Sequence, residues 1–363
     1  MNKIEIDLNA ITHNLGIFKK LIYPETKIIA VVKANAYGHG LIETARVIWT
    51  SGADILAVER LEEAVALRVA KIKAPILVTS YVEPDDYHKI IDFDLILSVN
   101  DFENAYRLSR EARKQNLWAR VDIEIDTGMN RWGISPYDFL QTYQRILDLE
   151  HTKIVGIHSH FADPLDLKFS REQMKILQNA LFTLQQGKIS IPMIHMASTN
   201  AILSNPETQF DAVRIGMGLF GYCNLKQDFN LKPALEYKTK IAHIRRVARG
   251  ESVGYYRIYV AKQPKKIAVL PVGYSDGYPR SLSNKAKVLV GGKKASVIGN
   301  VCMGATMIDI TGIDCSPEDE VILIGASGDD KVYADDLAKL ADSTTYEVLS
   351  RLPASILREY HFR

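Results

Sequence analysis

The sequence predicts an α/β protein: a (β/α)8 barrel of the TIM type followed by a mainly-β C-terminal domain. Its 363 residues are too many for one comfortable core, so two domains are expected. Up to about residue 230, eight short apolar runs alternate with amphipathic stretches. Beyond that point, strand-like runs follow one another without helices between them, which indicates a different architecture.

The first part of the chain carries the barrel pattern. Apolar residues at helical spacing begin it, at Leu8, Ile11, Leu15, Phe18 and Ile22. The eight apolar runs that follow lie near residues 28–33, 54–58, 76–79, 94–98, 118–125, 153–158, 192–196 and 210–215. A doubly wound sheet is the structural alternative, but it gives no reason for the number of strands to stop at eight.

The rest of the chain has the texture of a β-rich domain. Turn residues, such as those at 291–292 and 325–328, separate its strand-like runs, and a helical turn is expected around Tyr333–Ala341. The runs lie near residues 235–247, 266–270, 286–290, 295–298, 305–309 and 320–324.

The alternating segment Ile4–Leu8 precedes the first barrel helix and has no place in the barrel. It is expected to add a strand to the second domain. We therefore expect residues 9–230 to form the barrel, and residues 231–363 together with residues 1–8 to form the β-rich domain.

Composition excludes several classes of function. Lys and Arg number 45 against 43 Asp and Glu, a net charge of +2, so no nucleic-acid or membrane partner is indicated. The N-terminus lacks the apolar stretch of a secretion signal, and no apolar run approaches the roughly 20 residues of a membrane span. The three cysteines form no CxxC pair, so we expect neither disulfides nor structural zinc, and a cytoplasmic location.

Candidate catalytic residues lie where the predicted barrel strands end, because barrel enzymes place their chemistry at the C-terminal strand ends. Lys33 ends the first strand, and a desolvated lysine there would be a carbonyl nucleophile. Pairing of Lys33 with a strand-end acid is an equally supported alternative. Gly38 and Gly40, with the glycines after the eighth strand, favour a phosphate site nearby. The other strand-end residues are Glu124, Asp126, Arg131, His158, His160, His195, Arg214, Gly216 and Gly218.

Eight segments, in chain order, carry a specific resemblance. They are Val32–Gly40, Asp126–Gly133, Ser159–Ala162, Val213–Gly216, Val253–Tyr256, Val272–Gly277, Gly299–Met303 and Tyr346–Glu347. Over essentially the whole chain, these segments resemble the motifs of the alanine racemase family, a family of fold-type III pyridoxal-phosphate enzymes. Any one motif is weak, but their number and order make the resemblance specific.

The resemblance implies a pyridoxal 5'-phosphate enzyme that racemises L- and D-alanine and supplies D-alanine for cell-wall peptidoglycan. Lys33 would carry the cofactor and act on one face of the substrate, and Tyr255 would act on the other face. The family's homodimer implies that Tyr255 comes from the neighbouring subunit. Serine or another small amino acid is the alternative substrate. No metal is implied.

Further roles carry over residue by residue. His160 and Arg214 would form the network around Tyr255, and Arg214 would also face the pyridine nitrogen as a permanent donor. The resemblance assigns cofactor binding to Tyr37, Thr199, Gly216 and Tyr346, with Thr199 standing where a serine is usual. Arg131 and Met303 would bind the substrate.

Simpler interpretations remain open for several of these residues. Arg214 could pair with Asp211 or Asp126, and Tyr346 could be a core residue. Tyr255 and Tyr256 could be two strand aromatics, one on each face of the sheet.

Thr199 keeps the hydroxyl donor of the usual serine, and two other departures from the family pattern matter more. Glu124 stands where a carbamylated lysine is frequent, and Gly304 stands where an aspartate follows the methionine. Asp122, Glu124 and Asp126 share one face of the fifth barrel strand, so they need partners. We expect cationic ones, with Arg131 the nearest candidate and Arg120 and Arg214 the others.

Three other functions compete with this one. A metal-dependent barrel hydrolase would use His158 and His160 as an HxH ligand pair, but it leaves Lys33 without a role. A fold-type III decarboxylase of basic amino acids would carry a Gly-Gly-Gly phosphate loop, which has no match here. A non-enzymatic pyridoxal-phosphate-binding protein would be a single barrel, without a second domain bearing Tyr255.

Overall fold

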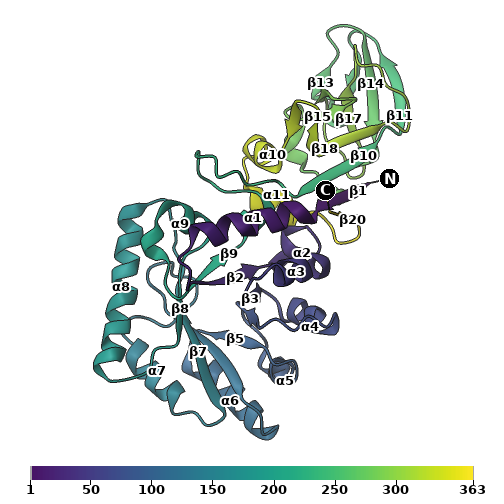
Figure 1. The fold of residues 1–363 in the computed structure, drawn as a ribbon. Helices are drawn as coiled ribbons and strands as arrows, with labels where there is room; N and C mark the ends of the chain where they lie inside the picture. Colours follow the sequence, from purple (N-terminus) through teal and green to yellow (C-terminus); the bar gives the residue numbers. More distant parts are fainter. Residues whose placement is uncertain (1, 363) are drawn as a thin grey trace.

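The computed structural model describes residues 2–362 of the chain. Figure 1 shows two lobes, a barrel ringed by helices and a β-rich lobe beside it, with the two chain ends close together where the lobes meet. The predicted architecture, a (β/α)8 barrel followed by a mainly-β domain, is confirmed.

Eight parallel strands close the barrel in chain order, and each corresponds to one of the eight predicted runs. The strands are β2 (Lys27–Val31), β3 (Ile55–Val58), β4 (Ile76–Val78), β5 (Ile96–Val99), β6 (Ala119–Glu124), β7 (Thr152–His158), β8 (Met193–His195) and β9 (Ala212–Ile215). Closure is made by the pairing of β2 with β9, in which Ile29 lies opposite Arg214.

Helices cover the outside of the barrel and bury their apolar faces against the strands. They are α1 (Leu8–Leu21), α3 (Leu41–Thr50), α4 (Leu61–Val69), α5 (Tyr87–Asp92), α6 (Phe102–Lys114), α7 (Phe139–Leu147), α8 (Leu167–Gln186) and α9 (Thr199–Ser204). Asp7 begins α1 as its N-cap, with its carboxylate accepting the backbone N–H groups of Asn9 and Ala10.

The second lobe is built on one large sheet in the order β11-β14-β17-β16-β15-β18-β10-β1-β20, with β19 paired to β18. Its strands are β1 (Lys3–Asp7), β10 (Leu235–Lys240), β11 (His243–Val247), β14 (Lys265–Leu270), β15 (Lys287–Val290), β16 (Lys293–Val297), β17 (Thr306–Asp309), β18 (Glu320–Ser327), β19 (Asp330–Val332) and β20 (Leu357–His361). A separate two-stranded ribbon consists of β12 (Ser252–Val253) and β13 (Tyr259–Val260). Helices α10 (Ala334–Ala341) and α11 (Thr345–Ser350) complete the lobe.

Strand β1 belongs to this sheet, as the sequence predicted. It pairs antiparallel with β10 and parallel with β20. The single run expected at 235–247 is wrong, because it divides into β10 and β11, which lie far apart in the strand order. Strand β20 was not predicted, since its mixed sequence Leu357–His361 has no clear apolar alternation.

The barrel interior has an apolar layer beneath a polar one. The apolar layer consists of Ile29, Ile55, Ala57, Leu77, Ile96 and Ala212. Buried polar residues from the later strands, including Asp122, His158 and His195, lie beyond it. The polar end of the barrel interior is therefore where chemistry can occur. Among residues 2–362, no helix is long and apolar enough to cross a membrane.

Candidate active site

Lys33 directly follows β2 and begins α2 (Lys33–Tyr37), a turn of unusual hand. Residues 34–37 all have φ between 51 and 55°, in the left-handed region. Each non-glycine residue there costs about 1–2 kcal/mol. Local hydrogen bonds offset this cost: Gly40 N donates to Asn35 O at 2.9 Å, and Leu41 N donates to Asn35 Oδ1 at 2.9 Å. The backbone that carries Lys33 is therefore strained but well held.

The glycines that flank this turn serve packing. A Cβ on Gly38 would lie 2.2 Å from Leu349 O, and a Cβ on Gly40 would lie 1.9 Å from Tyr360 Oη. Their amides donate to carbonyls inside the turn. Arg358 Nε also donates to Gly38 O at 2.9 Å. The expectation that these two amides meet a phosphate is therefore wrong, since the glycines instead let the C-terminal segment of the second lobe pack on the turn.

The side chain of Lys33 forms an ion pair with Glu59, which follows β3, at an Nζ–Oε2 distance of 3.4 Å. Glu59 is thus the strand-end acid that the sequence offered as an alternative partner of Lys33. Both side chains keep solvent contact, with exposed fractions of 35% and 46%. The single chain therefore does not desolvate Lys33 fully, and its amine is accessible from the barrel mouth.

A cradle of small and hydroxyl-bearing residues lies beside Lys33. Thr199 Oγ1 accepts the backbone N–H groups of Gly216 and Gly218 at 3.2 and 3.3 Å. A Cβ on Gly216 would lie 2.6 Å from Tyr37 Oη, so only glycine fits there. The Tyr346 ring lies 6.0 Å from the Tyr37 ring, at the exposed edge. The fold therefore brings Tyr37, Thr199, Gly216 and Tyr346 together from four distant segments.

Arg214, at the end of β9, is the buried hub of the barrel mouth. Its Nη1 donates to His195 Nδ1 at 2.5 Å, and its Nη2 donates to His160 Nδ1 at 3.0 Å. The carbonyls of Ser159, His195 and Met196 accept further N–H groups. Burial lowers the pKa of Arg214 to about 10, so the guanidinium stays charged near neutral pH. Burial and the charge of Arg214 lower the pKa of His160 well below its usual value.

The three acids expected to share one strand face, Asp122 and Glu124 in β6 and Asp126 just after it, have partners of different kinds. Asp122 accepts hydrogen bonds from two imidazoles, and Glu124 Oε2 lies 3.8 Å from His158 Nε2. Asp126 Oδ1 accepts the backbone N–H groups of residues 128–130. The expectation of arginine partners is therefore wrong, because imidazoles and backbone amides satisfy these carboxylates.

The arginines have other contacts. Arg120 pairs with Asp94 at 2.9 Å, and Arg131 is exposed. Arg131 nevertheless lies near the hub, since its charge contributes to the lowered pKa values of His160 and Arg214. Pairing of Arg214 with Asp211 or Asp126 is also wrong: Asp211 accepts from Ile194 N, and Asp126 is used by its own loop.

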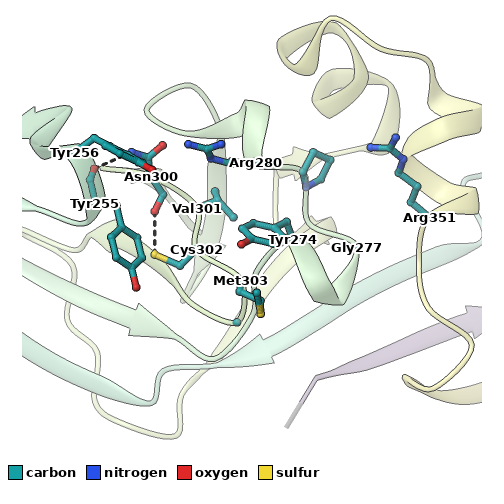
Figure 2. Close-up of a pocket in the computed structure, with 12 residues that line it drawn as sticks. Tyr255, Tyr256, Tyr274, Gly277, Arg280, Asn300, Val301, Cys302, Met303 and Arg351 are labelled. Carbon is teal, nitrogen blue, oxygen red and sulfur yellow. Dashed lines mark hydrogen bonds between the residues drawn. The ribbon is translucent and has the colours of Figure 1, made fainter.

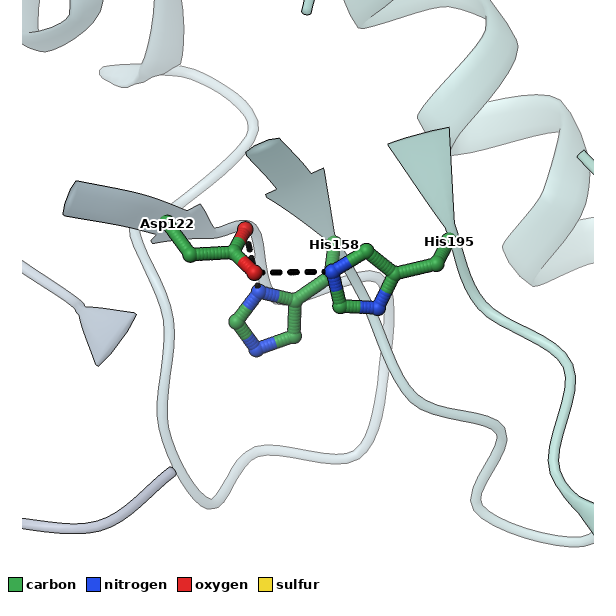
Figure 3. A group of neighbouring side chains, drawn as sticks. All are labelled: Asp122, His158 and His195. Carbon is green, nitrogen blue, oxygen red and sulfur yellow. Dashed lines mark hydrogen bonds and ion pairs between the residues drawn. The ribbon is translucent and has the colours of Figure 1, made fainter. Parts of the chain in front are cut away.

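Figure 3 shows the imidazoles of His158 and His195 turned toward the carboxylate of Asp122. Asp122 Oδ1 lies 3.1 Å from His158 Nδ1, and Asp122 Oδ2 lies 2.8 Å from His195 Nε2. The two rings are stacked and only 4° from parallel. A ligating nitrogen points at its metal within its own ring plane, so this geometry disfavours one ion bound by both imidazoles. The HxH pair also diverges, because His160 faces Arg214.

The remaining site residues lie on the second lobe. Tyr255, in the short helix η4 (Tyr255–Arg257), and Met303 are 68% and 63% exposed. Figure 2 shows both on the wall of an open hollow of about 990 Å³. The hollow is lined by Tyr255, Tyr256, Tyr274, Gly277, Pro279, Arg280, Asn300, Val301, Cys302, Met303, Gly304 and Arg351, all from the second lobe.

The predicted site residues thus form two groups within one chain. The barrel group contains Lys33 and Arg214 with the cradle residues, and the second-lobe group contains Tyr255 and Met303. The simpler interpretation of Tyr255 and Tyr256 as two strand aromatics, one on each face of the sheet, is wrong, because both lie in the short helix η4 and are largely exposed. Sequence reasoning did not assign Asp122 and Glu59 to the site, although the acidic alternation of β6 was a usable signal for Asp122.

The fold is a (β/α)8 barrel joined to a β-rich lobe. A lysine follows the first barrel strand, and an arginine bound to imidazoles lies at the barrel mouth. These features define a class of barrel enzyme in which a lysine amine acts on the substrate or cofactor. Residues 6–224 match the family description "Alanine racemase, N-terminal domain", and residues 234–360 match "Alanine racemase, C-terminal domain". The chain belongs to the alanine racemase family and is an amino-acid racemase, an isomerase.

Similar proteins agree with this assignment. The alanine racemase of Halothermothrix orenii is 40% identical over 362 residues, covering 98% of this chain and 96% of that protein. The alanine racemase of Clostridium perfringens is 39% identical over 364 residues, covering 98% and 94%. Among solved structures, alanine racemase from Streptomyces lavendulae has a TM-score of 0.95 at 28% identity, covering 99% and 97%. The Bacillus anthracis enzyme with bound L-Ala-P has a TM-score of 0.93 at 30% identity, covering 99% and 95%.

Proposed function

We propose that the protein interconverts L- and D-alanine in the cytoplasm by a two-base mechanism, with pyridoxal 5'-phosphate held on Lys33. The D-alanine would supply cell-wall peptidoglycan. The observation that carries the proposal is the division of the site residues. An accessible lysine stands beside a small-residue cradle in the barrel, and an exposed tyrosine stands on the other lobe.

The residues of the barrel fit the cofactor. The Tyr37 hydroxyl lies where a side chain on Gly216 would be, and Thr199 Oγ1 accepts the Gly216 N–H, so two hydroxyl donors suited to a phosphate group meet at this glycine. The Nη hydrogens of Arg214 go to protein acceptors, which leaves Nε–H as the donor available to a pyridine nitrogen. When bound, the cofactor would withdraw electrons from the substrate's α-carbon and acidify its proton.

Two groups must then move the α-proton. Lys33 Nζ takes or returns it on one face of the substrate, and the Tyr255 hydroxyl does so on the other. In a homodimer, Tyr255 of the partner subunit would face Lys33, since Tyr255 of the same chain is exposed and lines a hollow made only of second-lobe residues. Arg131 would bind the carboxylate of the substrate, and Met303 would contact the substrate from the second lobe.

The test uses the purified protein with single L-amino acids in deuterium oxide. For alanine, we expect deuterium to appear at the α-carbon, which NMR detects. We also expect equal amounts of the two enantiomers, which a chiral column separates. Borohydride treatment should fix the cofactor on Lys33, located by peptide mapping. Tyr255→Phe should lower racemisation by about a hundredfold or more without loss of the cofactor's absorbance. Carbon dioxide release instead of racemisation, or label on another lysine, would contradict the proposal.

A further inference from the structure

The guanidinium of Arg214 is buried without a carboxylate in contact. Each of the hydrogen bonds that Arg214 makes within residues 2–362 ends on a carbonyl oxygen or an imidazole nitrogen. A buried cation of this kind ordinarily requires a compensating anion. The nearest anion connected to it is Asp122, which reaches Arg214 through His195.

The hydrogens along this chain can be assigned from donor chemistry. Arginine has donors only, so His195 Nδ1 must accept from Arg214. Burial lowers the pKa of His195 to about 4, and a neutral ring with a bare Nδ1 carries its proton on Nε2. That N–H donates to Asp122 Oδ2, and the other oxygen of Asp122 accepts from His158 Nδ1. The carboxylate therefore selects the tautomer that Arg214 needs.

The surrounding strands are shaped for this carboxylate. Asp122 lies opposite Gly156 in the β6–β7 pairing, next to an irregularity of register between Val121 and Asp122. A Cβ on Gly156 would lie 2.6 Å from Asp122 Oδ1, so a larger residue would displace the carboxylate. Asp122 is 1% exposed and His195 is fully buried, so water does not compete for these hydrogen bonds.

We propose that Asp122 is a positioning residue that acts through His195 to hold Arg214 in place. The carboxylate keeps His195 in the tautomer with a bare Nδ1, and the bare nitrogen binds Arg214 Nη1. This leaves Nε–H of Arg214 directed toward the cofactor, a step that rests on the proposed function. Without Asp122, His195 can turn an N–H toward the guanidinium, and two donors then face each other.

Two variants separate the effects. In Asp122→Val, both imidazoles lose their acceptor, and the buried Nε2–H of His195 is left without a partner. This cost opposes the need of Arg214 for a bare Nδ1, so His195 should become a mixture of tautomers, and pyridoxal phosphate should bind about tenfold more weakly. In Asp122→Asn, the amide oxygen can accept from one imidazole only. Because Arg214 still needs a bare His195 Nδ1, His158 is the ring that should change tautomer, with affinity within about threefold of the parent.

Tautomers are measured by 15N NMR of the full-length protein labelled at histidine, with the two signals identified by replacing each ring singly. Cofactor affinity is measured by titrating the stripped protein with pyridoxal phosphate. Glu124→Gln is the matched control, since it removes the next carboxylate on the same face of β6, which contacts His158 but not His195. It should leave the His195 tautomer as in the parent.

A folded Asp122→Val protein with the parent His195 tautomer overturns the proposal, and so does a changed tautomer with unchanged affinity. If Asp122→Val does not fold, Asp122→Asn decides: a change at His158 supports the proposal, and unchanged rings or a change at His195 overturn it. If the parent binds no pyridoxal phosphate, the proposed function fails. The NMR result then still reports on the pairing of Asp122, His195 and Arg214.

Discussion

At the scale of single residues, Gly304 and Glu124 are the two departures from the family pattern that change the chemistry of a position most. Gly304 lies on the open hollow of the second lobe, and nothing lies within 4 Å of a Cβ built on it. Glu124 is buried beside His158 at the end of β6. The first change removes a side chain next to Met303, and the second supplies a carboxylate inside the barrel.

Gly304→Asp should sharpen the preference for alanine, because the free space beside Met303 would then be filled by a charged side chain. We expect the ratio of kcat/KM for alanine to that for serine to rise about tenfold. Gly304→Asn is the control for size without charge and should give a smaller rise. Equal ratios in all three proteins would leave Gly304 as an ordinary loop glycine.

Glu124→Gln should weaken substrate binding or turnover, if the carboxylate does the work of a carbamylated lysine and holds Arg131 through water. No ion pair within residues 2–362 joins the two directly, and Glu124 instead faces His158. We expect about a tenfold loss in kcat/KM, with parent activity unchanged in bicarbonate-free buffer. Parent-like kinetic constants in Glu124→Gln would show that the charge of this residue is not used.

At the scale of elements, the left-handed turn α2 is the part of the fold that depends most on its surroundings. Four consecutive residues there occupy a conformation that is unfavourable for side chains. His39 stabilises the turn by hydrogen bonds and packing. Its Nδ1 donates to Ala36 O and Tyr37 O at 3.0 and 2.9 Å, and its ring packs on Phe220. The turn that carries Lys33 is thus supported by a buried neutral imidazole.

This arrangement predicts a pH dependence of stability. Burial lowers the pKa of His39 from 6.5 to about 4, so below pH 6.5 the unfolded chain binds the proton first. The free energy of unfolding should therefore fall between pH 6.5 and 4, by about 3 kcal/mol from this group. His39→Gln should be less stable at pH 7, but its disadvantage should shrink toward pH 4. Urea unfolding at pH 7 and pH 4.5 measures this difference, and an equal gap at both pH values would contradict it.

At the scale of the whole molecule, the two groups of site residues lie on separate lobes. Figure 1 shows the ribbon of β13 at the end of the second lobe that points away from the barrel. Tyr255 and Met303 lie in this part of the lobe and are exposed. The function proposed above therefore requires a second copy of the chain, and we propose that each lobe would cover the barrel of its partner.

Subunit mixing tests this arrangement. Lys33→Ala and Tyr255→Phe should each be inactive alone, but a mixed dimer would hold one site with both functional residues. Random exchange should therefore restore about a quarter of the parent activity, because half of the dimers are mixed and each has one good site. Each variant treated alone is the control. Absence of recovery after exchange has been verified by mass would place both residues in one subunit.

The barrel itself could be predicted because its signals are local. Each of the eight strands is a short apolar run, and a lysine after β2 or an arginine at the end of β9 is read directly from the chain. The second lobe was less accessible. One expected strand became β10 and β11, and β20 went unnoticed, because pairing partners rather than local pattern define those strands.

The sequence by itself determined the fold class and the family, because apolar period and motif order are properties of the chain alone. Only the tertiary structure decided which side chains pair with one another. Asp122 meets His195 across 73 positions and Arg214 meets His160 across 54, contacts that depend on barrel closure. The acids of β6 consequently found imidazoles and backbone amides, not the arginines nearest in sequence. Burial between neighbouring strands, rather than charge alone, selects the partner of a carboxylate.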